Sequence, residues 1–264
     1  MNPFPTSLTI EDIELAAFDS PDSLFHRIIH EIRRPKQSVL SYLNVHVANQ
    51  AVQDRRLKLL LQDADCVYCD GAGIKLGAKM LGKHIPTRLT AADWFLEMLA
   101  TLSEAKCSVY ILGGMPGVPE KMMDVLREKL PAHSVMGMHH GFILKDKALE
   151  AKVIDEINTL KPDLLIVGFG TPLQEYWMDD HKHELDVPAI LPLGAVMDYF
   201  TGELKRCPDW MGKAGLEWLY RFYAEPRRLF QRYVVGNPWF LSRIAYTAIK
   251  DTVFRKRQKP IPTS

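Results

Sequence analysis

Residues 63–93 read DADCVYCDGAGIKLGAKMLGKHIPTRLTAAD, and this stretch decides the fold. Its short apolar run at 65–69 has the composition of a buried strand and leads directly into Asp70, a glycine turn and a helical segment. In a doubly wound α/β sheet, chemistry gathers where strands end and helices begin. Asp70 is therefore a candidate base, and Gly71 allows a substrate to approach the backbone. The alternative is an aspartate that only caps the next helix.

Strand and helix patterns alternate about every 30 residues across the chain between residues 38 and 200. A short strand and turn precede them within residues 1–20. The segment DLLIVG is short and wholly apolar, as a central parallel strand should be. Strands are expected at 38–44, 65–69, 107–112, 134–138, 163–168 and 189–193, and helices at 22–32, 48–62, 74–81, 90–104, from 118, at 147–160 and from 173. This order predicts a parallel, Rossmann-like α/β sheet with right-handed crossovers, flanked by helices.

Glycine turns follow two further predicted strands. Gly113 and Gly114 form one of them, and Gly170 lies in the other, with Gln174 in the first turn of the helix beyond. A glycine loop between a strand and a helix presents backbone N–H groups and a helix N-terminus to a diphosphate. Neither turn matches GxGxxG or a P-loop, so the pattern alone does not identify a nucleotide site.

The segment 87–104 predicts a helix with a polar start. Thr90 is a good N-cap, and Asp93 three residues later completes a capping-box pattern. Arg88 lies on the preceding loop, where it is free to reach a phosphate or a carboxylate. The alternative for Arg88 is a solvated side chain, the usual state of a lone arginine.

Two motifs raise the question of metal or redox chemistry. Cys66 and Cys69 form a CxxC, but on a strand their side chains point to opposite faces, which favours buried packing. His139 and His140 are adjacent, and neighbours on an extended chain point apart, which favours packing or a nucleotide contact over a metal. Neither motif has partners at zinc-ligand spacing. We expect no metal and no cofactor.

The charge is distributed unevenly. Residues 205–259 carry 13 Lys/Arg and four Asp/Glu, a charge of +9, so the rest of a chain with net charge +1 carries −8. This asymmetry predicts an anionic partner: lipid, nucleic acid or diphosphate. No apolar run of about 18 residues is present and the first 18 residues do not resemble a secretory signal, so a cytosolic location is expected.

The basic tail predicts three short helices. One has an apolar stripe at Leu216, Leu219, Tyr220 and Tyr223, a second starts at Pro226 and ends at 236–238, and a third covers 239–254. Mixed aromatic, apolar and basic residues on short helices suit an anionic membrane surface. An ordinary helical subdomain or a nucleic-acid surface remains the alternative. The apolar tail faces could also pair protomers, so a homo-oligomer stays open.

Three stretches together resemble the WecG/TagA/CpsF glycosyltransferases, known as glycosyltransferase family 26. They read CDGAGIKLGAKMLG…PTRLTAADWF, VYILGGMPGVPEK…HHGFI, and IVGFGTPLQEYWM…LGAVMDYFTGELKRCPDWMGKAGLEWLYRFYAEPRRLFQRYVVGNP. The resemblance implies the α/β fold called GT-E, with a catalytic domain at 1–202 and a basic helical appendage at 203–264. It also implies an inverting transfer of a sugar from a UDP-sugar to a sugar on undecaprenyl diphosphate, at the cytoplasmic face of the bacterial inner membrane.

The same resemblance assigns roles to individual residues. Asp70 matches the family's proposed base, Asn44 its conserved Asn, and Arg88 and Gln174 polar residues of the same pocket. Further matches are Asp198 near the uracil, Phe142 where many members have Tyr, and the tail arginines Arg221 and Arg228, thought to close over the site. Departures at Tyr42, at Thr171 and in the run LGAVMD lie around the donor pocket. The donor sugar (ManNAc, glucose or a uronic acid) therefore stays open.

These observations lead to one hypothesis for the mechanism. Asp70 takes the acceptor proton, Asn44 orients the acceptor or the base, and the Gly113 and Gly114 amides with Arg88 and the tail arginines stabilise the leaving diphosphate. The main alternative is a membrane-recruited nucleotide-binding protein of Rossmann type without transferase activity. A nicotinamide-dependent oxidoreductase and a nucleic-acid-binding protein are further rivals, and we expect neither.

Overall fold

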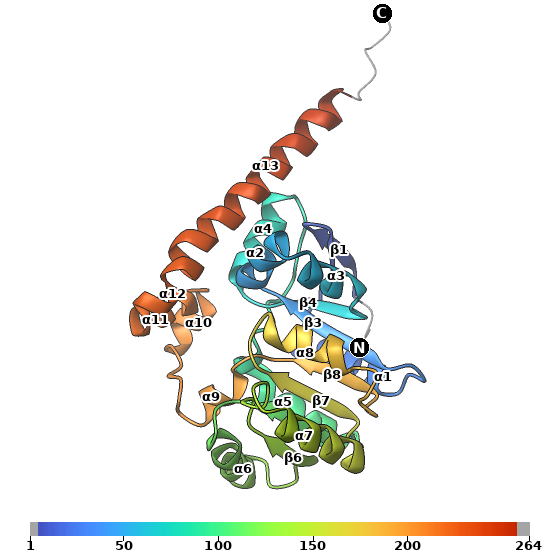
Figure 1. Ribbon diagram of the computed structural model, residues 1–264. Helices are drawn as coiled ribbons and strands as arrows, with labels where there is room; N and C mark the ends of the chain where they lie inside the picture. Colours follow the sequence, from blue (N-terminus) through green and yellow to red (C-terminus); the bar gives the residue numbers. More distant parts are fainter. Residues whose placement is uncertain (1–4, 258–264) are drawn as a thin grey trace, which may run out of the picture.

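The computed structural model describes residues 5–257, in which a single eight-stranded sheet forms the centre of an α/β body (Figure 1). The strand order is β1-β2-β4-β3-β8-β7-β5-β6. An antiparallel hairpin of β1 and β2 forms one edge, and all other pairings are parallel. The strands are β1 (Ser7–Ile10), β2 (Ile13–Ala16), β3 (Ser38–Leu43), β4 (Cys66–Cys69), β5 (Val109–Gly113), β6 (Val135–His139), β7 (Leu164–Gly168) and β8 (Ala189–Pro192).

Helices cover both faces of the sheet, which confirms the predicted α/β class. One face packs against α1 (Pro21–Ile32), α5 (Ala91–Glu104), α6 (Val118–Lys129) and α9 (Val196–Phe200). The other face packs against α2 (Val45–Gln53), α3 (Arg55–Asp63), α4 (Ala72–Met80), α7 (Lys147–Leu160) and α8 (Leu173–His181). The central strands are buried on both faces, as parallel strands between two helical layers must be. Cys66 and Cys69 are buried in the cores on opposite faces, as predicted.

The single helix predicted at 48–62 is wrong, because the chain breaks it into α2 and α3 at Asp54. The backbone of Asp54 is extended, and its side chain accepts a hydrogen bond from the Leu57 amide at 3.1 Å. Tyr176 of α8 also donates its hydroxyl to this carboxylate. An aspartate that caps the next turn favours a new helix start over continuation.

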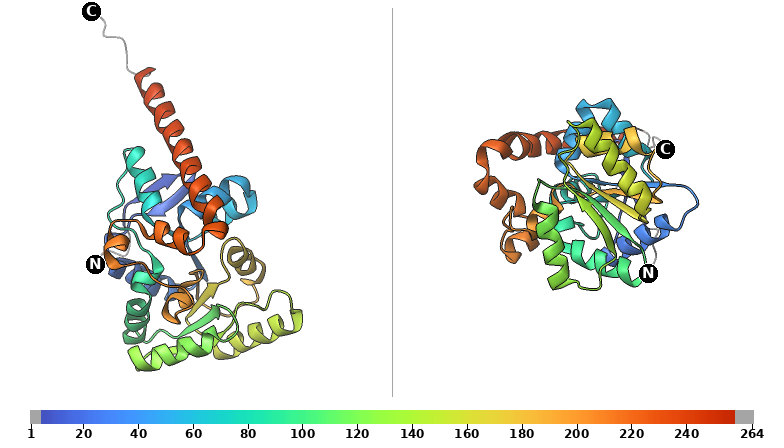
Figure 2. Two further views of the ribbon diagram at one scale, coloured as in Figure 1. Left: turned by 90° about the vertical axis from the view of Figure 1, so that its left-hand side faces the viewer. Right: turned by 60° about the horizontal axis from the view of Figure 1, so that its bottom comes forward.

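The tail is helical, but its boundaries differ from the prediction. It contains α10 (Asp209–Lys213), α11 (Glu217–Ala224), α12 (Pro226–Phe230), a π-helical turn (Gln231–Val235) and the long α13 (Gly236–Arg257), which extends beyond the body (Figure 1, Figure 2). The segment 236–238 does not end a helix. A proline ring clashes with the carbonyl four residues earlier, and here that carbonyl belongs to Val234, inside the wider π turn that accommodates the ring.

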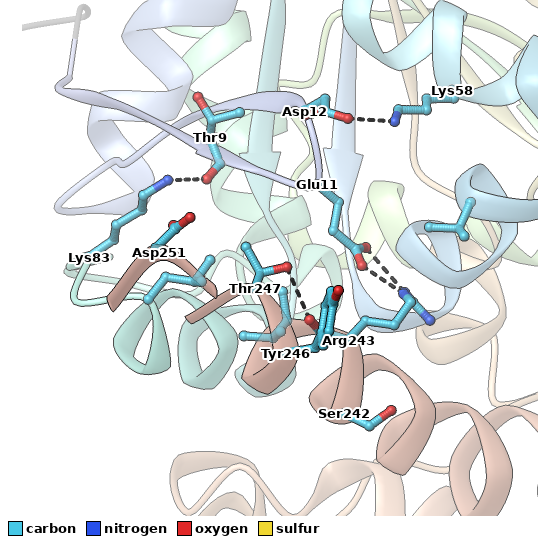
Figure 3. Close-up of a pocket in the computed structure, with 13 residues that line it drawn as sticks. Thr9, Glu11, Asp12, Lys58, Lys83, Ser242, Arg243, Tyr246, Thr247 and Asp251 are labelled. Atoms are coloured by element: carbon cyan, nitrogen blue, oxygen red, sulfur yellow. Dashed lines mark hydrogen bonds and ion pairs between the residues drawn. The ribbon is translucent and has the colours of Figure 1, made fainter. Parts of the chain in front are cut away.

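Helix α13 is part of the hydrophobic core of the body. Phe240 and Ile244 are buried against α2 and α4, and a Cβ added at Gly77 of α4 would lie 2.9 Å from the Phe240 ring. Arg243 donates to both carboxylate oxygens of Glu11, at 2.7 and 3.1 Å, and its ion pair ties α13 to the β1–β2 hairpin (Figure 3). Among residues 5–257, no helix is both long enough and apolar enough to cross a membrane.

Candidate active site

The candidate site lies where the strand order of the sheet reverses. From β3 the chain continues to β4 on one side, while β8 pairs with β3 on the other. The carboxyl ends of these three strands deliver Asn44, Asp70 and Gly194 to the same edge. This edge is the usual place for a ligand in an open α/β sheet, and several of the residues predicted from the sequence lie at it.

Asp70 and Asn44 are directly hydrogen-bonded. The Asn44 Nδ2 donates to Asp70 Oδ2 at 3.0 Å, while its Oδ1 accepts from the Val47 amide at 3.0 Å and caps α2. Because the amide oxygen is used by the helix cap, the NH₂ group must face the carboxylate. Helix α4 begins after Gly71 without a side-chain cap. The alternative that Asp70 is only a helix cap is therefore wrong.

The capping box predicted for Thr90 and Asp93 is also wrong. The Thr90 side chain makes no bond to its own helix, and its hydroxyl instead helps to lower the pKa of the Asp70 carboxyl. Asp93 pairs with Arg206 of the tail. Burial raises the pKa of the Asp70 carboxyl, while the bonds from Asn44 and Thr90 and the charges of nearby arginines oppose this shift. The result is a carboxylate more basic than an exposed aspartate, as a general base requires.

The raised pKa of Asp70 predicts the pH at which activity is lost on acidification. A base must be deprotonated, so kcat/KM is expected to fall as pH decreases through this pKa, with the midpoint above the ordinary value of 3.8. Replacing Thr90 by Val keeps the volume nearly constant but removes the hydroxyl that lowers the pKa of Asp70. The midpoint should therefore move to higher pH, as pH–rate profiles of the two proteins would show. An unmoved midpoint would mean that another group controls this limb.

Arg88 is held by the tail. Its Nη2 donates to the Gly212 carbonyl at 2.6 Å, its Nη1 lies 3.4 Å from Thr90 Oγ1, and Glu217 of α11 is 3.9 Å away. The charge of Arg88 also helps to lower the pKa of Asp70. The alternative of a solvated arginine is wrong, since Arg88 joins the base to the tail.

Arg232 and Glu217 also interact electrostatically with Asp70, although the sequence patterns did not indicate them. The Arg232 charge acts on Asp70, and it contributes, after burial, to a pKa of about 4 for His46. Its Nε is buried and has no hydrogen-bond partner among the described residues. For Glu217, burial and then the Asp70 charge raise the pKa of the carboxyl. No local pattern distinguishes Arg232 from the other tail arginines. Glu217 lies four residues before Arg221, and this i, i+4 spacing on a predicted helix could have indicated that the two side chains are neighbours.

Asp198 and the predicted tail arginines form a second group beside the first. Burial, and then Glu203, raise the pKa of Asp198, whereas Arg228 and Arg221 oppose the shift. The Oδ1 of Asp198 is buried without a partner among the described residues. The Arg221 guanidinium lies 5.6 Å from the Tyr199 ring centre, and Arg228 pairs with Glu225 at 2.6 Å. The arrangement offers two cations and a carboxyl to a polar ligand.

Glycines let three strand ends approach one another closely. A Cβ at Gly113 would lie 2.8 Å from the Gly168 carbonyl oxygen, and a Cβ at Gly168 would lie 2.4 Å from that of Gly194. Gly114 has a φ of +74°, which a glycine adopts without strain. Its carbonyl accepts from the Gly141 amide at 2.9 Å, and the next residue along, Phe142, is 62% exposed.

Gln174 braces the loops at this edge. Its side chain is fully buried, and its Oε1 accepts from the amides of Gly170 and Gly194 at 3.2 and 3.1 Å. Its Nε2 donates to the Tyr42 hydroxyl at 3.1 Å. Burial raises the pKa of Tyr42 to about 12, so this phenol stays protonated. A direct contact of Gln174 or Gly170 with substrate stays a prediction.

Glu175 follows Gln174 and is buried, and we expect its carboxyl to make the stability of the fold depend on pH. Burial raises the pKa of its carboxyl despite bonds from Gln174 at 2.9 Å and Thr171 at 2.9 Å. A carboxyl that binds its proton more tightly when folded costs stability as pH rises from its unfolded pKa through its folded pKa, about 1.4 kcal/mol per unit of difference. Glu175→Gln should therefore raise Tm relative to the wild type more at pH 8 than at pH 4.5. An equal change at both values in thermal unfolding would contradict this.

The adjacent histidines do not point apart as predicted. The rings of His139 and His140 pack with centres 4.2 Å apart, and His139 Nδ1 lies 2.9 Å from the His140 carbonyl oxygen. Among the described residues, no cluster of three His, Cys, Asp or Glu side chains could hold a metal ion.

Known proteins similar to this chain share one description. The model of the glycosyl transferase WecG/TagA/CpsF family matches residues 9–254. An N-acetylglucosaminyldiphosphoundecaprenol N-acetyl-β-D-mannosaminyltransferase of Bacillus subtilis is 27% identical over 239 residues, 88% of this chain and 87% of that protein. The proteins of the same name from Bacillus spizizenii and Staphylococcus aureus are each 27% identical, over 84% and 76% of this chain and 82% and 77% of theirs.

Proposed function

The chain belongs to the WecG/TagA/CpsF family of glycosyl transferases, and from this membership we propose that it moves a hexose or N-acetylhexosamine from a UDP-sugar to a sugar carried on a polyprenyl diphosphate. The names of the similar bacterial enzymes support an acceptor of this kind. The observation that carries the proposal is the Asp70 carboxylate, held by Asn44 at the switch point of the sheet with a raised pKa.

Asp70 acts as the general base in this proposal. The acceptor hydroxyl oxygen attacks C1 of the donor sugar while its proton moves to the Asp70 carboxylate. The bond from C1 to the diphosphate oxygen breaks, and UDP leaves with the electron pair. Attack on the face opposite the leaving group inverts the configuration at C1. Asn44 holds Asp70 in place, because its own amide is fixed by the cap of α2.

Charge on the departing UDP requires hydrogen-bond donors and cations. The Gly113 and Gly114 amides, Arg88, Arg221 and Arg228 would supply them, and charged guanidinium groups form strong bonds to phosphate oxygens. Arg88 would exchange its bond to the Gly212 carbonyl for a phosphate oxygen. The buried carboxyl of Asp198 would bind the nucleobase.

The tail at 203–264 would rest on the cytoplasmic face of the inner membrane and complete the site. Its predicted stripe is not covered by the body, since α11 buries no residue and Tyr223 is 87% exposed. Other large apolar side chains exposed on the described part of the tail include Trp210, Trp218, Leu219, Phe230, Val234, Val235, Tyr246 and Ile249. Apolar and aromatic groups among arginines suit an interface with anionic lipid.

A UDP-release assay tests the function. It would offer UDP-ManNAc, UDP-glucose, UDP-glucuronate and UDP-GlcNAc against polyprenyl-diphosphate-linked GlcNAc or glucose. UDP release with one donor and acceptor pair, lost in Asp70→Asn, is the expected result. UDP binding without release for any pair would favour the alternative, a membrane-recruited nucleotide-binding protein without transferase activity. No UDP binding would overturn both.

A further inference from the structure

Helix α4 of the body exposes apolar and basic side chains on one face. Leu76 is 47% exposed and Met80 38%, although each belongs to a helix whose opposite side is fully buried in the core. Lys79 and Lys83 are exposed beside them. Positions 76, 79 and 80 of α4 follow helical spacing, so these three side chains share one face, and Lys83 follows just after the helix.

The segment that contains α4 is basic and carries no carboxylate. Residues 71–92 include Lys75, Lys79, Lys83 and Arg88 but no Asp or Glu. Lys75 and Lys83 donate to the carbonyls of Pro86 and Thr9. A carbonyl oxygen does not neutralise an ammonium charge, so Lys75 keeps its charge along with the exposed Lys79, whereas Lys83 also lines a groove that contains Asp251. The face is therefore complementary to an anionic surface.

This face is continuous with the exposed side of α13. Leu76 directly precedes Gly77, against which Phe240 and Ile244 of α13 pack, so the two helices lie side by side. Further along α13, Tyr246 is 70% exposed and Ile249 63%. The left view of Figure 2 shows α4, α13 and the α10–α11 segment on one side of the molecule.

The open groove between α13 and the β1–β2 hairpin is a different feature. Its volume is about 650 Å³, and its lining includes Glu11, Asp12, Lys58, Arg243 and Asp251 (Figure 3). Both acidic and basic side chains line this groove, so it does not suit an apolar polyprenyl chain. The contact with lipid belongs to the exposed helix faces.

We propose that α4 is a second membrane-contacting element, which lies with α13 on an anionic bilayer. The proposal rests on the peripheral membrane location given above and extends it from the tail to the catalytic body. Two helices in contact with lipid fix the orientation of the body, whereas one tail helix alone would let it pivot. Since α4 starts one residue after Gly71, this orientation brings the Asp70 edge of the sheet close to a lipid-bound diphosphate.

Vesicle binding tests the proposal with full-length protein. The variant Leu76→Ser/Met80→Ser/Lys79→Glu changes only exposed side chains, so the fold should persist, as circular dichroism would show. Leu59→Ser/Met136→Ser is the matched control, because each of its side chains is 47% exposed and belongs to α3 or β6. We expect the α4 variant to bind vesicles containing phosphatidylglycerol on the order of tenfold more weakly than wild type, and the control to bind as wild type does.

Turnover separates this proposal from the proposed function. With a short-chain, water-soluble acceptor the α4 variant should match wild type, and with a long-chain acceptor in vesicles it should be slower. If wild type binds the vesicles and the α4 variant binds equally well, α4 has no role at the membrane, while the function stands. If wild type does not bind anionic vesicles, the peripheral location and the role of α4 both fail. Activity on the soluble acceptor still decides the transferase reaction by itself.

Discussion

Asp70→Asn is expected to lower kcat by about 10²- to 10⁴-fold, the usual contribution of a positioned general base. Asparagine keeps the shape of the side chain and can still bond to Asn44 after a rotation of one amide, but it cannot accept the acceptor proton. The affinity for the UDP-sugar should stay close to that of wild type, because the nucleotide is assigned to other residues. UDP release under saturating donor and calorimetric titration with UDP measure the two quantities.

The control for this substitution is Asp63→Asn. Asp63 is an exposed carboxylate at the end of α3, so its loss removes the same charge without touching the site. Turnover of the control should equal that of wild type. Comparable turnover of Asp70→Asn and Asp63→Asn would remove Asp70 from the role of base.

Phe240→Ala is expected to reduce the free energy of unfolding by about 3–5 kcal/mol. The ring is fully buried between α2 and α4 and fills the space that Gly77 leaves free. Its removal leaves a cavity where α13 packs against Gly77 of α4, so the helix loses a large apolar contact with the body. Urea unfolding followed by circular dichroism measures the change.

Phe230→Ala is the matched control for this prediction. Phe230 is 50% exposed on α12, so its truncation should cost no more than about 1 kcal/mol. If Phe240→Ala also cost that little, the tail would be docked mainly through the bonds of Arg243 to Glu11 and Asn49.

Much of the site could be predicted from residues that directly follow strands. Asp70, Gly113 and Gly170 are candidates because parallel strands deliver their carboxyl-end residues to one edge of a sheet, whereas Asn44 is a candidate through the family resemblance. The bond between Asn44 and Asp70 then follows from the pairing of β3 with β4. The domain boundary between residues 202 and 203 and the contacts with substrate remain proposals.

Other features of the site depend on residues far apart in the chain. Thr90 has the spacing of a capping box, yet its hydroxyl acts on the pKa of Asp70, because the end of β4 lies beside the start of α5. Arg88 was expected to be free, yet it binds Gly212 of the tail. Arg232 reaches Asp70 only because α13 is docked on α4 and positions the π turn before it.

The sequence by itself determined the alternating strands and helices, the parallel sheet and the carboxylate at a strand end. These depend on periodic burial and on glycine turns, which are local properties of the chain. Only the tertiary structure decided the order of strands, the contact of the tail with Arg88 and the effect of the Arg232 charge on Asp70. Those features arise from packing between segments far apart in the chain, and no local pattern of side chains encodes which distant partner a buried polar group will find.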